Sequence, residues 1–474
     1  MNLAERIRLS AEKHDGRTAV VFYDRRIRYG ELWADVEKLA AGLRDEGLAP
    51  GGRIALVMPN VPEYVAAFFA SLCCGAEVVS INPQYTAREI GFILKDASVG
   101  FVVVHPMFDM PVRTVAEKYP LKIFYSDSMG DPAKKDLKSL INQSAAVLKP
   151  VEKRPDDTAL IVYTNASGGY PMGACLTHDG LFFDADACRR VAVVDEMDTL
   201  LSVIPLYHAF SKTVCMNMPL LGGGKMVLHE TFNEDRVAID IEKERVSMFP
   251  AVPAIFKRLL DVHGNAGKNY SFVKAFIPGG APTPVPVLEG FAEAFNAAVY
   301  QGYGITECGP VTSVNPIYRK ENKLGSVGPP LSGIQVRVSE EGELCVKGRN
   351  VMKGYLGHDK ETQEFLIDGW FHTGDRARID GDGFIYITGH LKRLILVGGF
   401  NVYPGEVEMV LGAHPEVKSC KVFGEQNDLL GERVVAEVVL RDGAAIDAAE
   451  LRKYLRKRIA SYKTPRKIEI AMEN

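Results

Sequence analysis

The chain has 474 residues, of which 47% are apolar and 24% charged, and its formal net charge at pH 7 is −4. This length allows two or three hydrophobic cores, and the composition is typical of a globular protein. The slightly acidic balance argues against a nucleic-acid-binding surface. The charged N-terminus predicts no signal peptide, and the longest apolar segment, residues 64–76, is too short to span a bilayer.

The eight cysteines are scattered along the chain, and only Cys73 and Cys74 are adjacent. This spacing favours reduced thiols over a disulfide framework or a zinc site, and it indicates a cytoplasmic protein. The size favours an enzyme, and a homodimer is left open as its assembly.

Strands and helices are expected to alternate through the first 300 residues. Apolar residues recur at helical spacing between Leu32 and Leu43, and Gly47 with Pro50 ends that helix. A buried strand at 53–58, a helix at 62–74 and a strand at 77–81 follow. Further strands are predicted near 100–104, 200–204, 225–228, 274–277 and 297–300. This alternation predicts an α/β fold with largely parallel sheets.

The pattern changes near Gly325 to short strands separated by glycines, and the sequence Gly-Asp-Gly at 381–383 indicates a hairpin turn. After Gly389 comes a compact segment with a predicted strand at 434–440 and a basic helix at 448–460. We therefore predict a large domain at 1–388 and a small domain at 389–474.

The stretch YTNASGGYPMGACLTH at 163–178 follows a short apolar strand at 159–162. Its three glycines allow backbone N–H groups to approach an anion closely, so the loop is suited to cradle a phosphate. It lacks the G-K-[ST] sequence of a Walker loop, and Met172 occupies the position where a lysine is expected. A structural turn is the alternative interpretation.

Two further stretches contain residues suited to nucleotide chemistry. In QGYGITE at 301–307, a threonine hydroxyl beside a carboxylate can hold a phosphate and its Mg²⁺, and an aromatic ring can stack on a base. In Thr373-Gly-Asp375, a carboxylate in a turn can accept two ribose hydroxyls. Taken singly, both stretches are also explained as ordinary turns.

Taken together and in this order, the three stretches resemble the adenylate-forming superfamily, which includes acyl-CoA synthetases, luciferases and peptide-synthetase adenylation domains. The similarity continues through PLYHAFS at 205–211, IPGGAPTP at 277–284, GWFHTGD, GHLKRLILVGGFNVYPGEVE and SYKTPRKIEI. PLYHAFS and GFNVYPGEVE favour a CoA ligase for a fatty or aryl acid over a peptide-synthetase domain.

The resemblance implies a large domain of two α/β subdomains and a β-rich subdomain, followed by a small mobile α+β domain. It implies that ATP, with Mg²⁺, activates a small-molecule carboxylic acid as an acyl-adenylate, and that coenzyme A then displaces AMP. Phe210 and Phe249, in segments expected to form the acyl pocket, favour an apolar acid.

The resemblance also implies roles for single residues. Thr306 would contact the phosphate, Glu307 would hold Mg²⁺, and Asp375 would bind the ribose hydroxyls. His208 would lie at the mouth of the acyl pocket, with a buried core histidine as the alternative, and Lys392 would be the hinge of the small domain. The remaining implied nucleotide- and CoA-binding residues are Thr164, Ser167, Gly168 and Gly169 in the phosphate loop, Gly279, Gly280 and Ala281 at the adenine, Gly302, Tyr303 and Gly304 with Tyr303 stacked on the base, His390, and Gly398 and Gly399 near the pantetheine.

Three departures from the family pattern all concern adenylation. The family's phosphate loop resembles YTSGTTGxPKG, whereas this chain differs at 165, 166 and 168 and has Met172 in place of the lysine. His390 replaces an arginine that helps to anchor the nucleotide. The sequence ends at Asn474, before the loop that carries a further lysine in family members.

Two functions stay open at this point. The first is an acyl-CoA synthetase with a weakened adenylation step, and the second is an adenylation-deficient homologue that binds nucleotide or acyl-CoA. An intermediate hypothesis predicts that pre-formed acyl-adenylate is converted to thioester faster than the acid itself, relative to an ordinary ligase.

Overall fold

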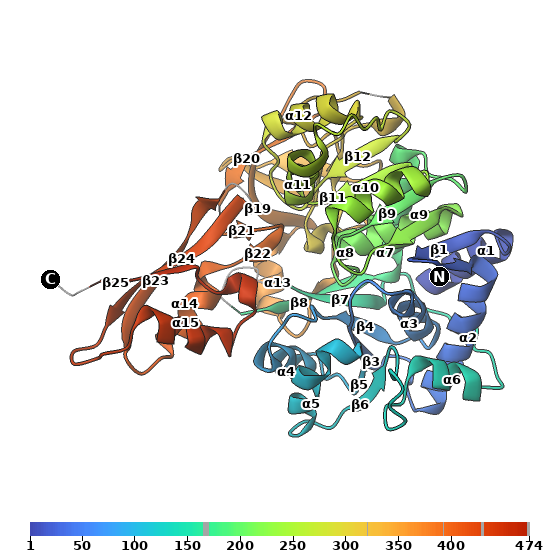
Figure 1. Cartoon of the computed structure of the whole chain (residues 1–474), viewed down its shortest axis with the longest axis horizontal. Coiled ribbons are helices and arrows are strands. Elements are labelled where there is room, and N and C mark those ends of the chain that lie inside the picture. The colour runs from blue at the N-terminus through green and yellow to red at the C-terminus, as the bar shows by residue number, and fades with distance from the viewer. Residues whose placement is uncertain (165–169, 320, 392, 428–430, 472–474) are drawn as a thin grey trace.

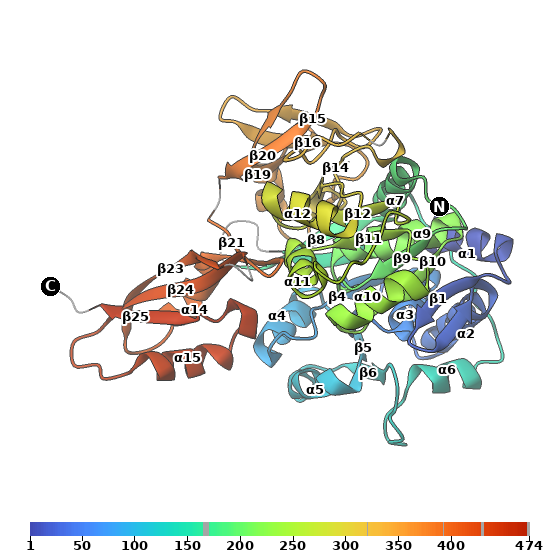
Figure 2. The same cartoon turned by 45° about the horizontal axis from the view of Figure 1, so that its top comes forward.

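The computed structural model describes residues 1–164, 170–319, 321–391, 393–427 and 431–471. Figure 1 shows a large α/β body and, beside it, a smaller body formed by the C-terminal strands, and Figure 2 shows the same separation from another direction. Four predicted site residues, Ser167, Gly168, Gly169 and Lys392, lie outside the described residues.

A seven-stranded sheet forms one half of the large body. In spatial order its strands are β17 (Gly354–Tyr355), β8 (Met172–Thr177), β7 (Thr158–Thr164), β4 (Glu77–Ser80), β3 (Arg53–Val57), β5 (Phe101–Val104) and β6 (Lys122–Tyr125). The strands from β7 to β6 are parallel, whereas β8 and β17 are antiparallel additions at one edge. The inner strands are apolar and buried, as expected for parallel strands covered by helices.

A six-stranded sheet forms the other half. In spatial order its strands are β12 (Ala275–Pro278), β11 (Met248–Ala251), β9 (Thr199–Ser202), β10 (Lys225–Leu228), β1 (Thr18–Phe22) and β2 (Arg25–Arg28). β1 runs parallel to β10, so the N-terminal segment completes a sheet built from residues much later in the chain. The prediction of an α/β fold with largely parallel sheets is confirmed.

Helices cover and connect the two sheets. They are α1 (Leu3–Lys13), α2 (Tyr29–Asp45), α3 (Pro62–Cys73), α4 (Ala87–Asp96), α5 (Asp109–Ala116), α6 (Leu137–Gln143), α7 (His178–Ala192), α8 (Ala209–Ser211), α9 (Met218–Gly222), α10 (Glu234–Lys243), α11 (Pro253–His263), α12 (Val285–Phe295) and α13 (Asp359–Phe365). There are also 3-10 helices η1 (Pro106–Phe108), η3 (Thr306–Cys308) and η4 (Ile317–Arg319), and a π-helix η2 (Lys212–Asn217). α7 packs on β7 and β8 and also on α9, which packs on β10, so this helix pair joins the sheets. Among the described residues, no helix is both long and apolar enough to cross a membrane.

Local sequence explains where several of these elements begin. α3 starts at Pro62, whose missing N–H is tolerated in the first helical turn. α4 starts with a capping box in which Thr86 and Glu89 bond each other's backbone N–H groups. The strand predicted at 297–300 is wrong, because Val299 forms only a single bridge with Phe276 after α12 ends.

Two small antiparallel sheets follow the large α/β part. The first contains β13 (Gly302–Tyr303) and β14 (Ser313–Val314), and the second contains β15 (Gln335–Val338), β16 (Glu343–Lys347), β19 (Trp370–Ile379) and β18 (Leu366–Ile367), with β20 (Ile385–His390) paired to β19. The hairpin predicted at 381–383 is confirmed, since it connects β19 to β20.

The C-terminal body has its own sheet and its own core. It contains β22 (Phe400–Val402), β21 (Ile395–Val397), β24 (Gly431–Leu440), β23 (Val417–Asn427) and β25 (Lys467–Ala471), with α14 (Pro404–Gly412), α15 (Ala448–Arg456) and η5 (Ser461–Lys463). The buried members of one hydrophobic cluster all lie between residues 395 and 468. Because β20 continues through His390, we propose that the domain boundary, predicted at 389, lies between His390 and Ile395.

Candidate active site

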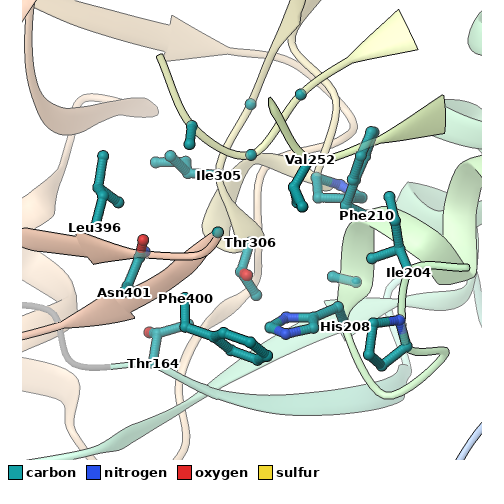
Figure 3. Close-up of a pocket in the computed structure, with 18 of the residues that line it drawn as sticks. Thr164, Ile204, His208, Phe210, Val252, Ile305, Thr306, Leu396, Phe400 and Asn401 are labelled. Carbon is teal, nitrogen blue, oxygen red and sulfur yellow. The ribbon is translucent and has the colours of Figure 1, made fainter. Parts of the chain in front are cut away.

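A cavity of about 1040 Å³ lies where the parallel sheets, the β-rich part and the C-terminal domain meet. Figure 3 shows Thr164, His208, Thr306 and Phe400 converging on this cavity from different elements. Every predicted site residue that the structure describes lines it: Thr164, His208, Gly279, Gly280, Ala281, Gly302, Tyr303, Gly304, Thr306, Glu307, Asp375, His390, Gly398 and Gly399. Motifs that are far apart in the sequence thus meet in one place.

Glu307 is a buried carboxylate in η3, with 8% of its surface exposed. The hydroxyl of Thr164 donates to Oε1 over 2.6 Å, and the hydroxyl of Tyr355 donates to the same oxygen over 3.0 Å. Among the described residues both of these bonds end on Oε1, which leaves Oε2 for a ligand. One carboxylate oxygen together with substrate phosphates suits Mg²⁺, so this donor set fits the ion that the sequence implies.

Asp375 lies in β19 opposite His390 of β20. The hydroxyl of Tyr303 donates to Oδ2 over 2.5 Å, and Nδ1 of His390 lies 2.6 Å from Oδ1. Each carboxylate oxygen keeps a further lone pair for a ribose hydroxyl. The hydrogen bond to Asp375 raises the pKa of His390 against the opposing effect of burial. His390, whose charge depends on pH, therefore occupies the position where the family pattern has an arginine, which is always charged.

Asp375 was expected in a turn, but it lies within β19, and Glu343 of β16 holds this part of the strand. Its Oε1 accepts the N–H of Gly374 over 2.7 Å, and its Oε2 lies 2.8 Å from Nδ1 of His372. Cys345 is the cross-strand partner of His372, and the ligand atoms of Glu343, Cys345 and His372 lie within 4.8 Å of one another. Since both carboxylate oxygens engage residues near Asp375 in β19, this group supports the part of the strand that carries Asp375.

Two glycines are required by close approaches in the cavity wall. A Cβ added to Gly304 would lie 1.8 Å from the carbonyl oxygen of Pro310, and one added to Gly279 would lie 2.9 Å from the ring of Phe210. No side chain fits at Gly304 without moving backbone. These glycines let the backbone itself form the wall.

His208 lies at the start of the helical segment made by α8, η2 and α9. Its ring centroid is 4.7 Å from that of Tyr207 and 5.6 Å from that of Phe400 (Figure 3). Burial and the nearby Lys212 lower the pKa of His208 to about 4, so the imidazole is neutral at pH 7. The structure places this histidine in the cavity wall, not in a closed core.

The side of the cavity near His208 is largely apolar. Ile204, Phe210 and Val252 line it (Figure 3), as do Cys188 and Val214. Charged side chains also reach the lining: Glu230 is one, and Arg258 and Glu234 form an ion pair over 2.7 Å. A mutually neutralised pair beside an apolar wall suits an apolar acid better than a second charge on the substrate.

Met172 is the first residue of β8 and is 5% exposed. It pairs with Thr164 across the β7–β8 ladder, so the two side chains share one face of the sheet. Thr164 uses that face to bond Glu307. A lysine at 172 would thus start on the face that carries the phosphate-side residues, although at a buried position.

The C-terminal domain closes the cavity through the turn between β21 and β22. A Cβ added to Gly399 would lie 2.7 Å from Cγ1 of Val252, and its φ of +89° is in the left-handed region that favours glycine. The ring of Phe400 points toward His208 (Figure 3). The turn predicted to approach pantetheine therefore lines the cavity in this structure.

Sequence reasoning missed the residues that hold the site together. The motif resemblance assigns no role to Tyr355 or Glu343. Their bonds to Glu307 and Gly374 join elements that are far apart in the sequence, and no spacing in the chain indicates such contacts.

Comparison with known proteins gives the family. The model for the AMP-binding enzyme family matches residues 7–356, and the model for the AMP-binding enzyme C-terminal domain matches residues 406–473. A feruloyl-CoA synthase from Amycolatopsis sp is 34% identical over 95% of this chain and 91% of its own length. A long-chain-fatty-acid–CoA ligase from Bacillus subtilis is 32% identical over 98% of this chain and 90% of its own.

Among solved structures, o-succinylbenzoate CoA synthetase from Bacillus subtilis, bound with a product analogue, superposes with a TM-score of 0.89. It shares 28% identity, and the match covers 98% of this chain and 94% of that one. The match therefore extends over both the large α/β body and the C-terminal body. The chain belongs to the AMP-binding enzyme family, within the adenylate-forming superfamily.

Proposed function

We propose that this protein is an AMP-forming acid–CoA ligase that acts on an apolar carboxylic acid. The observation that carries the proposal is the convergence of Glu307, Asp375 and Thr306 from the large domain with Gly399 and Phe400 from the small domain on one cavity. A nucleotide-activating site and a turn from the second domain thus share one chamber, as a two-step ligase requires.

In the first step the substrate carboxylate attacks the α-phosphate of ATP, the bond to pyrophosphate breaks, and an acyl-adenylate forms. Asp375 would bind the ribose hydroxyls, Tyr303 would stack on the base, and Thr306 would contact the phosphate. Mg²⁺ held by Glu307 would neutralise charge on the phosphates. Gly279, Gly280 and Ala281 would lie along the adenine.

In the second step the thiol sulfur of CoA bonds to the acyl carbon, the acyl–phosphate bond breaks, and AMP leaves. Gly398 and Gly399 would lie along the pantetheine, because their backbone lines the cavity without side chains. His208, which is neutral at pH 7, would lie at the junction between the acyl and thiol sides.

The apolar lining near His208 supports a fatty or aryl acid as the substrate, in agreement with the relatives named as fatty-acid and feruloyl ligases. The free cysteines, most of them buried, favour a cytoplasmic location. We keep a homodimer as a proposal to be tested by light scattering of the purified chain.

The decisive experiment is carboxylate-dependent ATP–pyrophosphate exchange with a panel of fatty and aryl acids, followed by CoA thioester formation from the same acids. The ligase predicts both activities. Exchange with none of the acids would contradict it.

The second candidate is an adenylation-deficient homologue that binds nucleotide or acyl-CoA. Buried Met172 and the titratable His390 favour it, since both replace a cation expected near ATP. It predicts AMP or acyl-CoA binding by calorimetry without pyrophosphate release.

A further inference from the structure

A buried cluster of three charges joins the two domains on the side of α4. Nζ of Lys463 lies 2.9 Å from Oε1 of Glu89 and 2.6 Å from Oε1 of Glu406. The three side chains are only 4%, 7% and 8% exposed, respectively. Glu89 belongs to the large domain, whereas Lys463 and Glu406 belong to the C-terminal domain, so one of the two ion pairs crosses between them.

The carboxylate of Glu89 does two things at once. Its Oε2 accepts the N–H and the hydroxyl of Thr86, both over 2.9 Å, and so caps α4. Its Oε1 is thereby aimed at Lys463. The Thr86 hydroxyl also approaches the main-chain oxygen of Arg458 at 3.1 Å, a second contact between the start of α4 and the small domain.

Burial alone would lower the pKa of Lys463, but Tyr85, Glu406 and Glu89 outweigh it and hold the pKa above the ordinary value. The ring of Tyr85 lies 4.7 Å from Nζ. The lysine is therefore charged at pH 7, and the crossing ion pair is a desolvated one. Breaking such a pair costs far more than breaking a pair in water.

The cluster is connected to the catalytic cavity by aromatic packing. Tyr462, the neighbour of Lys463, stacks on Phe400 with ring centroids 4.6 Å apart, and Phe400 in turn lies beside His208. Glu89, Lys463 and Glu406 themselves line the same cavity. A contact at α4 thus fixes where the Gly399–Phe400 turn sits.

We propose that Glu89 and Lys463 are positioning residues for the thiol-dependent step. Glu89, Lys463 and Glu406 together form what we call the interdomain latch. The latch holds the C-terminal domain in the position in which Gly398, Gly399 and Phe400 line the cavity. The assignment to thioester formation rests on the proposed ligase function. Adenylation would not need the latch, because hydrogen bonds within the large domain hold Glu307 and Asp375.

Glu89→Gln tests this with little change of shape. The glutamine carbonyl still caps Thr86, but its amide replaces the oxygen that faces Lys463. We expect thioester formation from pre-formed acyl-adenylate to fall about ten- to hundredfold, while ATP–pyrophosphate exchange changes by less than about twofold. Lys463→Met, which removes the same pair from the other side, is expected to show the same split.

The matched control is Glu31→Gln. Glu31 closes the capping box of α2 by accepting the N–H of Arg28 over 2.8 Å, but it lies exposed on the large domain. Both half-reactions should stay at the wild-type rate in this variant. Equal losses of exchange and thioester formation in Glu89→Gln would overturn the proposal, since they would indicate a general structural defect.

Hydrogen exchange measured by mass spectrometry tests the latch without any activity. In Glu89→Gln, amides at the start of α4 and also in residues 458–463 should exchange faster than in the wild type, and Glu31→Gln should leave both segments unchanged. Faster exchange confined to α4 would reduce Glu89 to a helix cap and overturn the interdomain contact. A wild type that forms no thioester from acyl-adenylate would instead overturn the ligase function and the assignment of the latch to that step.

Discussion

Lys212 is a fully buried lysine that the proposed reaction does not use. Its Nζ lies 2.6 Å from the hydroxyl of Tyr64 and 2.8 Å from that of Ser80, and those two hydroxyls are 2.9 Å from each other. Burial lowers the pKa of the amine well below its ordinary value. Removing the amine leaves Tyr64 and Ser80 bonded to each other, so no buried polar group loses its last partner.

Lys212→Met should therefore stabilise the protein, and by more at low pH. Because the folded pKa lies below the unfolded value of 10.5, the unfolded chain binds a proton that the folded chain does not, and wild-type stability falls as the pH drops below about 10. We expect the variant to gain about 1–3 kcal/mol at pH 7 and less at pH 9. Urea unfolding at both pH values measures this. The exposed lysine at 38 gives the control Lys38→Met, and a gain that does not depend on pH would contradict the prediction.

His390 should show the opposite pH dependence. Its pKa is raised above 6.5 by the hydrogen bond to Asp375, so the pair contributes fully below pH 6.5 and its contribution is lost as the pH rises through the folded pKa. His390→Asn keeps a hydrogen-bond donor without the charge. The variant should be less stable than the wild type at pH 5.5, with a smaller difference at pH 8, in guanidinium unfolding. A difference that grows with pH would be inconsistent with the ion pair.

At the scale of elements, the β7–β8 hairpin brings Met172 and Thr164 to the same face as Glu307. Met172→Lys places a cation on that face. We expect ATP–pyrophosphate exchange to rise about ten- to hundredfold, with a loss of stability because the site is buried. Met172→Gln, which adds polarity without charge, is the control. If glutamine raises exchange as much as lysine, charge is not the missing property.

Element boundaries were predictable where the chain itself supplies the signal. Pro62 fixes the start of α3, and apolar runs bounded by glycine or proline fix strands such as β3. The strand predicted at 297–300 failed because its apolar residues reflect burial beside β12 and not a ladder. The site residues came from motif resemblance, whereas their partners Tyr355 and Glu343 depend on strand pairing that only the folded chain shows.

At the scale of the whole molecule, the contact between Glu89 and Lys463 joins residues 374 positions apart. No periodicity or spacing predicts such a pair, because each residue has a local explanation. Glu89 caps α4, and Lys463 lies in the short helix η5. The arrangement of the large body and the C-terminal body decides which charges meet, and the proposed latch would stabilise that arrangement.

The same separation predicts that the C-terminal domain folds alone. Its hydrophobic cluster draws every buried member from residues 395–468, and Lys463 keeps Glu406 as a partner when Glu89 is absent. A fragment of residues 391–474 should therefore unfold cooperatively in urea. Its free energy of unfolding should be lower than in the intact protein, because Lys463 loses its ion pair with Glu89 and Phe400 loses its contact with His208. Circular dichroism during urea titration measures the unfolding transition, and hydrogen exchange of the backbone amides measures the stability of the folded fragment.

Fragments that begin later provide the control for this boundary. A fragment of residues 399–474 lacks β21, whose Ile395 and Val397 are 1% and 7% exposed in the core of the domain. Deleting two buried aliphatic side chains and a strand costs several kcal/mol, so this shorter fragment should lose its cooperative transition. If the 391–474 fragment also unfolds without cooperativity, the small domain depends on the large one for its fold. The boundary proposed between His390 and Ile395 would then be wrong.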